Sequence, residues 1–140
     1  MKAFIAGVSS YLPKTILDND MLAQQFPEWS VEKIFAKTGI RKRHIAGDDE
    51  GCLSMAVAAS EALFLKYKVN KDEIDFVLLC TQSPDYFLPT TACLVQSSLG
   101  LPTTCGALDF NLGCSGYVYG LSLAKGLIET HQARNVLLIT

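Results

Sequence analysis

Three short apolar runs alternate with three segments of helical periodicity along most of the chain. In chain order we expect a helix over residues 52–67, a strand over 74–80, a helix over 91–99, a strand over 105–112, a helix over 115–130 and a strand over 134–140. Strands that are separated by helices join through right-handed crossovers, which makes neighbouring strands parallel. The alternation therefore predicts an α/β fold, with helices covering a mostly parallel mixed sheet.

The first part of the chain is less regular. We expect a buried strand over residues 3–8, short helices over 21–26 and 31–37, and a basic extended segment over 40–45. Ser30 is placed to cap the second of these helices, and Gly39 supplies the glycine that commonly ends a helix. These signals indicate an entry region that precedes the regular α/β order.

The helix expected over residues 115–130 is unusually apolar. From Tyr117 to Ala124 it has no charged residue, and Lys125 is the first one. A helix that is apolar all round is normally buried. One sheet with a single layer of helices on each face would hardly bury it, and the chain closes on an apolar run that reaches Thr140. We therefore expect a buried central helix, covered by a second half of the same protein or by a partner subunit.

Composition narrows the function classes. The 140 residues are 49% hydrophobic and 19% charged, with a net charge of −2. These values are typical of a soluble globular domain, whereas a nucleic-acid-binding domain is usually basic. No apolar run has the length of a membrane span, and the first residues lack the cleavage site of a signal peptide. We expect a cytoplasmic protein without a nucleic-acid or membrane partner.

Five cysteines and two histidines are spread along the chain without a C-x-x-C pair. Such an odd, widely spaced set fits neither a disulfide framework nor a zinc site, so we expect no metal. Four of the cysteines lie in apolar runs and are interpreted as core residues, because free cysteine is often buried. These four are Cys52, Cys80, Cys93 and Cys105.

Cys114 differs from the others because Gly113 and Gly116 flank it at a strand-to-helix junction. A helix N-terminus carries about half a unit of positive charge and free N–H groups. A cysteine in that position can have a pKa of about 3.5 to 7.5 instead of about 8.5. The pattern predicts that Cys114 is a nucleophile. The turn alone equally allows a buried thiol in a glycine-rich packing contact.

Four separated phrases occur in an order and spacing that resemble one family. They are Ser9–Pro13, Thr38–Ile45, Pro89–Cys93 and Asp109–Gly116. Together they resemble the N-terminal half of β-ketoacyl-acyl-carrier-protein synthase III, in the thiolase superfamily, and the resemblance covers essentially the whole chain. It implies that residues 1–140 form the first half of a duplicated, layered α/β/α architecture whose C-terminal half is absent from this chain.

The resemblance implies a condensing acyltransferase that initiates fatty-acid synthesis. An acyl-coenzyme A would acylate Cys114, and a decarboxylative Claisen condensation with malonyl-acyl carrier protein would give 3-oxoacyl-acyl carrier protein. The backbone N–H of Cys114 would also belong to the oxyanion hole, and the histidine and asparagine of the triad would lie beyond Thr140. A homodimer is implied, with a coenzyme A thioester as substrate and no separate cofactor. The chain alone is expected to be inactive.

The resemblance also implies substrate-binding residues. Trp29 would stack on the adenine of coenzyme A, and Lys37 and Arg41 would hold its phosphates. A staple that anchors the helix is the alternative for Trp29, and a solvated basic turn is the alternative for the two cations. Phe87 and Leu88 fall in a loop that crosses the dimer interface in the family. Leu88 replaces a larger aromatic of the short-chain members and would admit a longer primer, unless the loop is an ordinary interface with Phe87 turned inward.

Two other hypotheses for the function stay open at this point. One is a synthase III-like acyltransferase of specialised metabolism that uses another acyl acceptor. The other is a non-catalytic thiolase-fold assembly module, although alanine would serve a packing role as well as Cys114 does. A papain-like protease is disfavoured, because its cysteine is normally followed by a histidine and an asparagine in the same chain.

Overall fold

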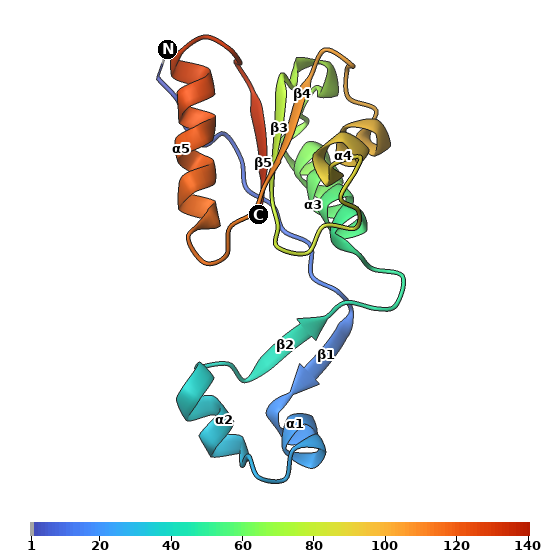
Figure 1. The fold of residues 1–140 in the computed structure, drawn as a ribbon, viewed down its shortest axis with the longest axis vertical. Helices are drawn as coiled ribbons and strands as arrows, with labels where there is room; N and C mark the ends of the chain where they lie inside the picture. The colour runs from blue at the N-terminus through green and yellow to red at the C-terminus, as the bar shows by residue number, and fades with distance from the viewer. Residues whose placement is uncertain (1) are drawn as a thin grey trace. The chain divides into compact units, whose positions relative to one another are not determined.

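The computed structural model describes residues 2–140 and divides the chain into two compact units. The larger unit combines the segment that ends at Tyr11 with residues 51–140, and the smaller unit is Leu12–Glu50. Figure 1 shows the two units along the coloured chain. Residue 1, which the predicted half-domain included, lies outside the described residues.

A three-stranded parallel sheet forms the centre of the larger unit. β3 (Phe76–Cys80) is its middle strand, with β4 (Gly106–Phe110) on one side and β5 (Val136–Ile139) on the other, both parallel to it. The middle strand is apolar along its length, and its central side chains are buried. This is the pattern expected of a strand that is covered on both faces.

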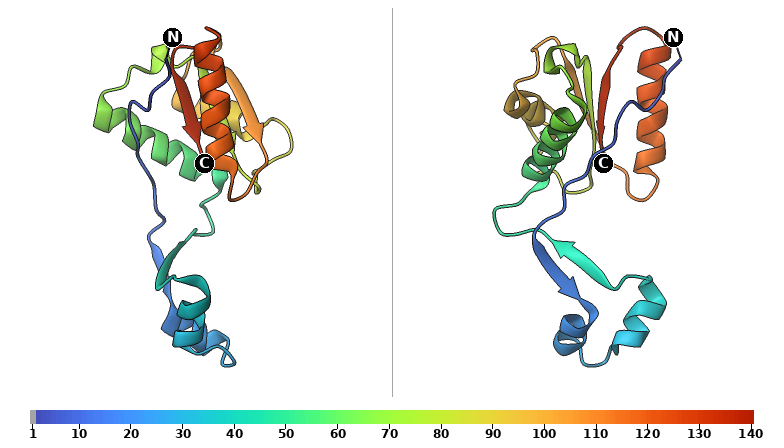
Figure 2. Two further views of the ribbon diagram at one scale, coloured as in Figure 1. Left: turned by 90° about the vertical axis from the view of Figure 1, so that its left-hand side faces the viewer. Right: turned by 180° about the vertical axis from the view of Figure 1, so that it is seen from behind.

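Helices cover both faces of this sheet. α3 (Cys52–Tyr67) and α4 (Thr91–Leu99) lie on one face, and α5 (Gly116–Glu129) lies on the other (Figures 1 and 2). A short 3-10 turn, Lys71–Glu73, joins α3 to β3. The main core lies between the sheet and the α3–α4 face, and it includes Phe64, Val77, Leu79, Val95 and Leu99. The predicted layered α/β/α order is therefore present in this unit.

Two glycines bring α5 close to the sheet. A Cβ on Gly120 would lie 2.6 Å from Leu138 Cδ1, and a Cβ on Gly116 would collide with Cys80 Sγ. These are the two residues of α5 that are buried. One stripe of the helix therefore packs on β3 and β5 at a distance that only glycine allows.

Much of the remaining surface of α5 is exposed, which differs from the predicted buried helix. Tyr117, Val118 and Tyr119 are each more than half exposed, Val118 by 63%. The helix forms the outermost layer on its face, so the sheet fully buries only the two glycines, and four further residues are partly buried: Leu121, Ala124, Leu127 and Ile128. The burial that its apolar sequence predicts is not found within this chain.

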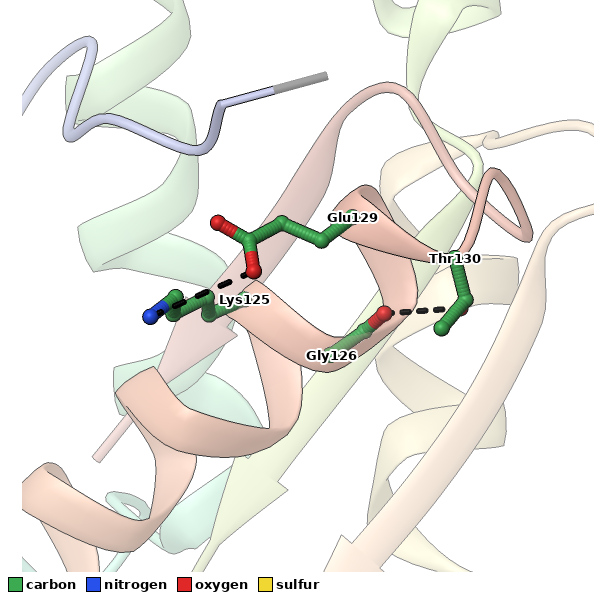
Figure 3. A network of polar contacts seen from close by, with 4 residues as sticks. All are labelled: Lys125, Gly126, Glu129 and Thr130. Carbon is green, nitrogen blue, oxygen red and sulfur yellow. Dashed lines mark hydrogen bonds and ion pairs between the residues drawn. The ribbon is translucent and has the colours of Figure 1, made fainter.

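Charged residues on α5 begin at its C-terminal end. Lys125 Nζ lies 4.0 Å from Glu129 Oε2, and the Thr130 hydroxyl donates to the Gly126 carbonyl at 2.7 Å (Figure 3). An exposed i,i+4 pair of this kind contributes about 0.3–0.5 kcal/mol. The polar end of the helix is thus suited to solvent, in contrast to its apolar first turns.

The expected strand over residues 3–8 is wrong. This segment has no strand geometry, and Phe4, Ile5 and Val8 are largely exposed. The carbonyl of Val8 accepts a hydrogen bond from the Tyr67 hydroxyl at 3.2 Å. The apolar composition is that of a strand, but a strand forms only where another strand offers a hydrogen-bonding edge, and within residues 2–140 this segment pairs with none.

The smaller unit contains two strands and two helices. β1 (Thr15–Asp18) pairs antiparallel with β2 (Lys42–Ile45), and α1 (Asn19–Gln25) and α2 (Val31–Thr38) follow β1. The predicted caps of α2 are confirmed, because Ser30 accepts from the Lys33 N–H at 3.3 Å and Gly39 has a φ of 68°. The sequence missed β1, since four residues are too few to show a period.

The four cysteines interpreted as core residues divide into two groups. Cys80 and Cys105 are buried as predicted, whereas Cys52 is half-buried and Cys93 is exposed. The prediction is therefore wrong for Cys93. Its apolar neighbours Ala92 and Val95 occupy the buried side of α4, which leaves Cys93 on the outer side of the helix.

Candidate functional site

Cys114 lies in a tight turn between β4 and α5. The N–H of Gly116 donates to the Gly113 carbonyl at 2.8 Å, and the helix proper begins at Gly116. Cys114 is exposed, so the alternative of a buried packing thiol is not supported in this chain. The predicted order of strand, turn, cysteine and helix is found, although Cys114 precedes the first helical residue by one hydrogen-bonded turn instead of lying inside the helix.

The N-terminus of α5 has no side-chain cap. Ser115, its N-cap residue, has helical backbone angles of φ −87° and ψ −6° and makes no capping hydrogen bond, and the first turn contains no acidic residue. The first N–H groups of a helix lack intrahelical partners and favour anions. The end of α5 next to Cys114 is thus suited to bind an anion that develops beside the thiol.

Cys80, at the end of β3, contacts the residues on both sides of this turn. Cys80 Sγ donates to the Leu112 carbonyl at 3.3 Å, and the same sulfur occupies the space that a side chain at Gly116 would need. The glycine at this position therefore has a packing role, because it allows the first turn of α5 to rest on Cys80. The geometry of the Cys114 turn depends on this contact.

A shallow pocket of about 170 Å³ opens at the C-terminal ends of β3 and β4. Its lining residues are Thr81, Pro84, Tyr86, Phe87, Thr90, Asp109, Phe110 and Asn111. Most of them belong to the segment 81–90 that joins β3 to α4, which we call the pocket loop, and the others continue β4 toward Cys114. In α/β folds, ligands bind outside the C-terminal ends of the strands.

The tip of the pocket loop is exposed. Phe87 is 96% exposed and Leu88 is 82% exposed, and Tyr86 beside them is also largely exposed. Phe87 is not turned inward, so that alternative does not hold in this chain. An exposed apolar cluster of three consecutive residues is unusual on a protein surface that meets only water.

Two carboxylates that the sequence did not single out fix the base of this site. Asp85 Oδ2 accepts from the Leu53 N–H at 2.7 Å, at the start of α3. Asp109 accepts from the N–H groups of Thr91 and Ala92, at the start of α4. Neither contact has a local sign in the sequence, because Thr90 is itself a common N-cap residue type, and the missing side-chain caps of Gly51 and Thr90 are seen only in the structure.

The pKa of the Cys52 thiol is raised in this environment. Burial is the main cause, the negative charges of Asp85 and Asp109 add to it, and a hydrogen bond with Thr81 partly opposes it. Cys52 is the first residue of α3. Burial and the nearby carboxylates thus favour the neutral thiol at Cys52, although it stands at a helix start.

Three of the predicted substrate-binding residues lie in the smaller unit. Lys37 Nζ lies 5.6 Å from the centroid of the Trp29 ring, and the guanidinium carbon of Arg41 lies 4.6 Å from the ring centroid of Phe35. Both distances are within the range of cation–π contacts. The structure therefore brings Trp29 and Lys37 together, whereas Arg41 contacts a different aromatic ring.

Two further properties concern residues 2–140 alone. Within this range, no group of three or more His, Cys, Asp and Glu side chains is arranged to hold a metal ion. No helix in the same range is long and apolar enough to cross a bilayer.

Comparisons with known proteins find relatives of one description in both sequences and solved structures. The family described as 3-oxoacyl-[acyl-carrier-protein (ACP)] synthase III matches residues 108–140. The β-ketoacyl-[acyl-carrier-protein] synthase III of Xanthomonas oryzae pv. oryzae is 44% identical over 135 residues, which are 96% of this chain and 41% of the relative. The chain thus spans about two-fifths of the length of the curated relatives that it matches.

Solved structures give the same result. A crystal structure of a 3-oxoacyl-(acyl-carrier-protein) synthase III is 58% identical with a TM-score of 0.94, over 99% of this chain and 41% of that one. The 3-oxoacyl-(acyl-carrier protein) synthase of Burkholderia xenovorans LB400 is 38% identical with a TM-score of 0.92, over 99% of this chain and 40% of that one. These matches confirm the resemblance and the fold class that were predicted from the sequence.

Proposed function

We propose that this chain, which corresponds to the N-terminal part of β-ketoacyl-acyl-carrier-protein synthase III, supplies the nucleophile half of a condensing active site. The proposed enzyme takes an acyl group from acyl-coenzyme A onto Cys114. It then joins that group to malonyl-acyl carrier protein with loss of carbon dioxide, which initiates a fatty-acid chain.

The observation that carries this proposal is the exposed Cys114 at the uncapped start of α5. In the first step its thiolate would attack the thioester carbonyl, and the oxyanion that forms would be stabilised by N–H groups at the turn, the Cys114 N–H among them. Coenzyme A would leave as its own thiolate. Thiolates suit this exchange because they are both good nucleophiles and good leaving groups.

In the second step, malonyl-acyl carrier protein would lose carbon dioxide and become an enolate. The enolate carbon would attack the acyl-cysteine carbonyl, and the Cys114 thiolate would depart with its electron pair, which returns the enzyme to its starting state. The histidine and asparagine that stabilise the enolate oxygen are proposed to come from outside these 140 residues. For that reason the chain by itself is proposed to be inactive in condensation.

The smaller unit is proposed to bind coenzyme A. Trp29 offers an aromatic face for the adenine, and the ammonium of Lys37 already lies against that ring. Arg41 is the second proposed phosphate ligand, because a guanidinium binds phosphate oxygens in a fork. The coenzyme A thioester is the substrate, and no separate cofactor or metal is proposed.

The proposed assembly is a homodimer in the cytoplasm, with no nucleic-acid or membrane partner. The exposed Phe87 and Leu88 support a contact between subunits, since they are the apolar tip of the pocket loop.

Leu88 also favours one second candidate function, an acyltransferase of specialised metabolism that uses another acceptor. Its side chain is smaller than an aromatic one, so a longer acyl primer would fit. Acylation with acyl-coenzyme A primers of graded length tests whether a longer primer fits. A strict preference for acetyl-coenzyme A would contradict the longer primer.

Mass spectrometry tests the nucleophile directly. The full-length protein that contains this chain is incubated with acyl-coenzyme A, and one acyl group is expected on the peptide that carries Cys114. Cys114→Ala should gain no acyl group, whereas Cys93→Ala, which removes another exposed cysteine near a helix start, should be acylated normally. An acyl group that persists in Cys114→Ala would falsify the assignment.

A further inference from the structure

We propose that Asp109 is a positioning residue, which fastens the start of α4 and the pocket loop to the strand that presents Cys114. The proposal rests on the nucleophile role of Cys114 proposed above. It concerns how the thiol and the pocket are held in one fixed geometry.

The first observation is the pair of hydrogen bonds that Asp109 accepts. Its Oδ2 accepts from the Thr91 N–H at 2.7 Å, and its Oδ1 accepts from the Ala92 N–H at 2.6 Å. Thr91 and Ala92 are fully buried, so no water competes for these donors. A carboxylate that accepts two backbone N–H bonds at a helix N-terminus is held by charge-assisted bonds and by the helix dipole.

The second observation is that both ends of the pocket loop are tied to the same strand. At its first residue, the Thr81 N–H donates to the Phe110 carbonyl at 3.2 Å. At its last residue, Thr90 leads directly into the two N–H groups that Asp109 holds. Two consecutive residues of β4 therefore fix both ends of a loop whose tip lines the pocket.

The third observation is the path from this clamp to the thiol. Asp109, Phe110 and Asn111 all line the pocket, and the chain then passes through Leu112 to the Cys114 turn. A shift of α4 away from Asp109 would therefore move the pocket wall relative to Cys114. Because a misplacement of about 1 Å can reduce a rate by about 100-fold, this clamp matters for chemistry as well as for folding.

The chain offers a matched control for this clamp. Asp75 Oδ2 accepts from the N–H groups of Arg134 and Asn135, at 2.7 and 2.9 Å. It therefore holds two backbone donors, although through one oxygen where Asp109 uses both. It precedes β3 and its donors precede β5, at the opposite ends of the strands. Asp75 does not line the pocket.

The experiment compares Asp109→Asn with Asp75→Asn in the full-length protein that contains this chain. The single-turnover rate of Cys114 acylation by acyl-coenzyme A is measured for each variant, together with denaturant stability. In Asp109→Asn, the amide keeps one acceptor but turns an N–H toward the other donor, so we expect a fall in acylation rate of about tenfold or more. In Asp75→Asn one amide oxygen can still accept from both donors, so this variant should lose little stability and keep its acylation rate within about twofold. Equal loss of rate in both variants overturns the proposal.

Two further measurements keep the result decisive. Amide hydrogen exchange in residues 81–92 should become faster in Asp109→Asn and stay unchanged in Asp75→Asn, and this readout holds even if Cys114 is never acylated. An unacylated wild-type protein would thus overturn the proposed function alone, and unchanged exchange would overturn the positioning role alone.

If Asp109→Asn does not fold, Asp109→Glu keeps the carboxylate on a longer stem, and it should retain the fold with a reduced acylation rate. A wild-type rate in a folded Asp109→Glu also counts against the proposal.

Discussion

Cys52 and Cys114 of the larger unit both lie at the start of a helix, but their burial and their neighbours differ. Cys52 is the first residue of α3, is half-buried, and has Asp85 hydrogen-bonded to the next N–H along the helix. Cys114 precedes α5, is exposed, and is followed by a first turn with neither an acidic residue nor a side-chain cap. The comparison shows that a helix start alone does not make a thiol reactive. At Cys52, burial is the main cause that raises the pKa of the thiol, and the nearby carboxylates of Asp85 and Asp109 add to it.

The largest expected effect is a difference in alkylation rate between these two thiols. Near neutral pH, Cys114 should react with iodoacetamide on the order of 100-fold faster than Cys52, because the Cys52 thiol has a raised pKa and is partly buried. Timed alkylation followed by peptide mass spectrometry measures both rates in one sample. Cys93, which is exposed, reports the effect of exposure alone. Equal rates for Cys52 and Cys114 would remove the basis of the comparison.

The second effect concerns the contact between Gly116 and Cys80, on which the Cys114 turn rests. In Gly116→Ala, the new methyl group collides with Cys80 Sγ, and overpacking of this kind costs about 1–3 kcal/mol. The matched variant is Gly126→Ala in the same helix, where no heavy atom lies within 4 Å of the new Cβ. That variant should gain about 0.5–1 kcal/mol, since alanine is the better helix former. Urea unfolding measures both, and a stable Gly116→Ala would show that the turn can move away from Cys80.

The third effect makes the helix start at Cys52 resemble the one at Cys114. Asp85→Asn removes a negative charge next to Cys52, so the pKa of the Cys52 thiol should fall and its alkylation rate should rise several-fold. The variant should lose less than about 1 kcal/mol, because the asparagine oxygen can still accept from the Leu53 N–H and asparagine caps about as well as aspartate. Asp20→Asn in the smaller unit is the control for charge removal in general. An unchanged rate for Cys52 would mean that the charge of Asp85 does not contribute to its pKa.

The smallest effect is a dependence of stability on pH. Burial raises the pKa of the thiols of Cys52 and Cys105 in the folded state. Above about pH 8.5 the unfolded chain loses these protons first, so it binds fewer protons than the folded chain and the free energy of unfolding falls as pH rises. Stability at lower pH should not depend on these groups. Urea titrations from pH 7 to about pH 10 should show this decrease, and Cys52→Ala with Cys105→Ala should flatten it.

The sequence predicted the regular part of the fold closely. The helix over 52–67 and the helix over 91–99 are found with those bounds, and the three predicted strands are present in shortened form. The Cys114 turn also lies where it was expected. These features depend on hydrophobic periodicity and on glycine positions within one element, so neighbouring residues contain the necessary information.

The errors concern features that depend on distant residues. Residues 3–8 have the composition of a strand but pair with no strand among the described residues, and α5 is apolar but only two of its residues, both glycines, are fully buried. The carboxylate that caps α4 comes from Asp109, on a strand that follows the helix, and no local capping signal reveals it. Cys93 lies in an apolar run and is nonetheless exposed.

By itself, the sequence determined the order of helices and strands over residues 52–140, the ends of α2 at Ser30 and Gly39, and the place of Cys114 in a glycine turn. Each of these is decided within a few residues, by backbone preference and by side-chain spacing. Only the tertiary structure decided which carboxylate satisfies which helix N-terminus, so that Asp85 and Asp109 serve α3 and α4 while the start of α5 stays open. The physical reason is that burial and charge act through space, and the residues that set them lie far apart along the chain.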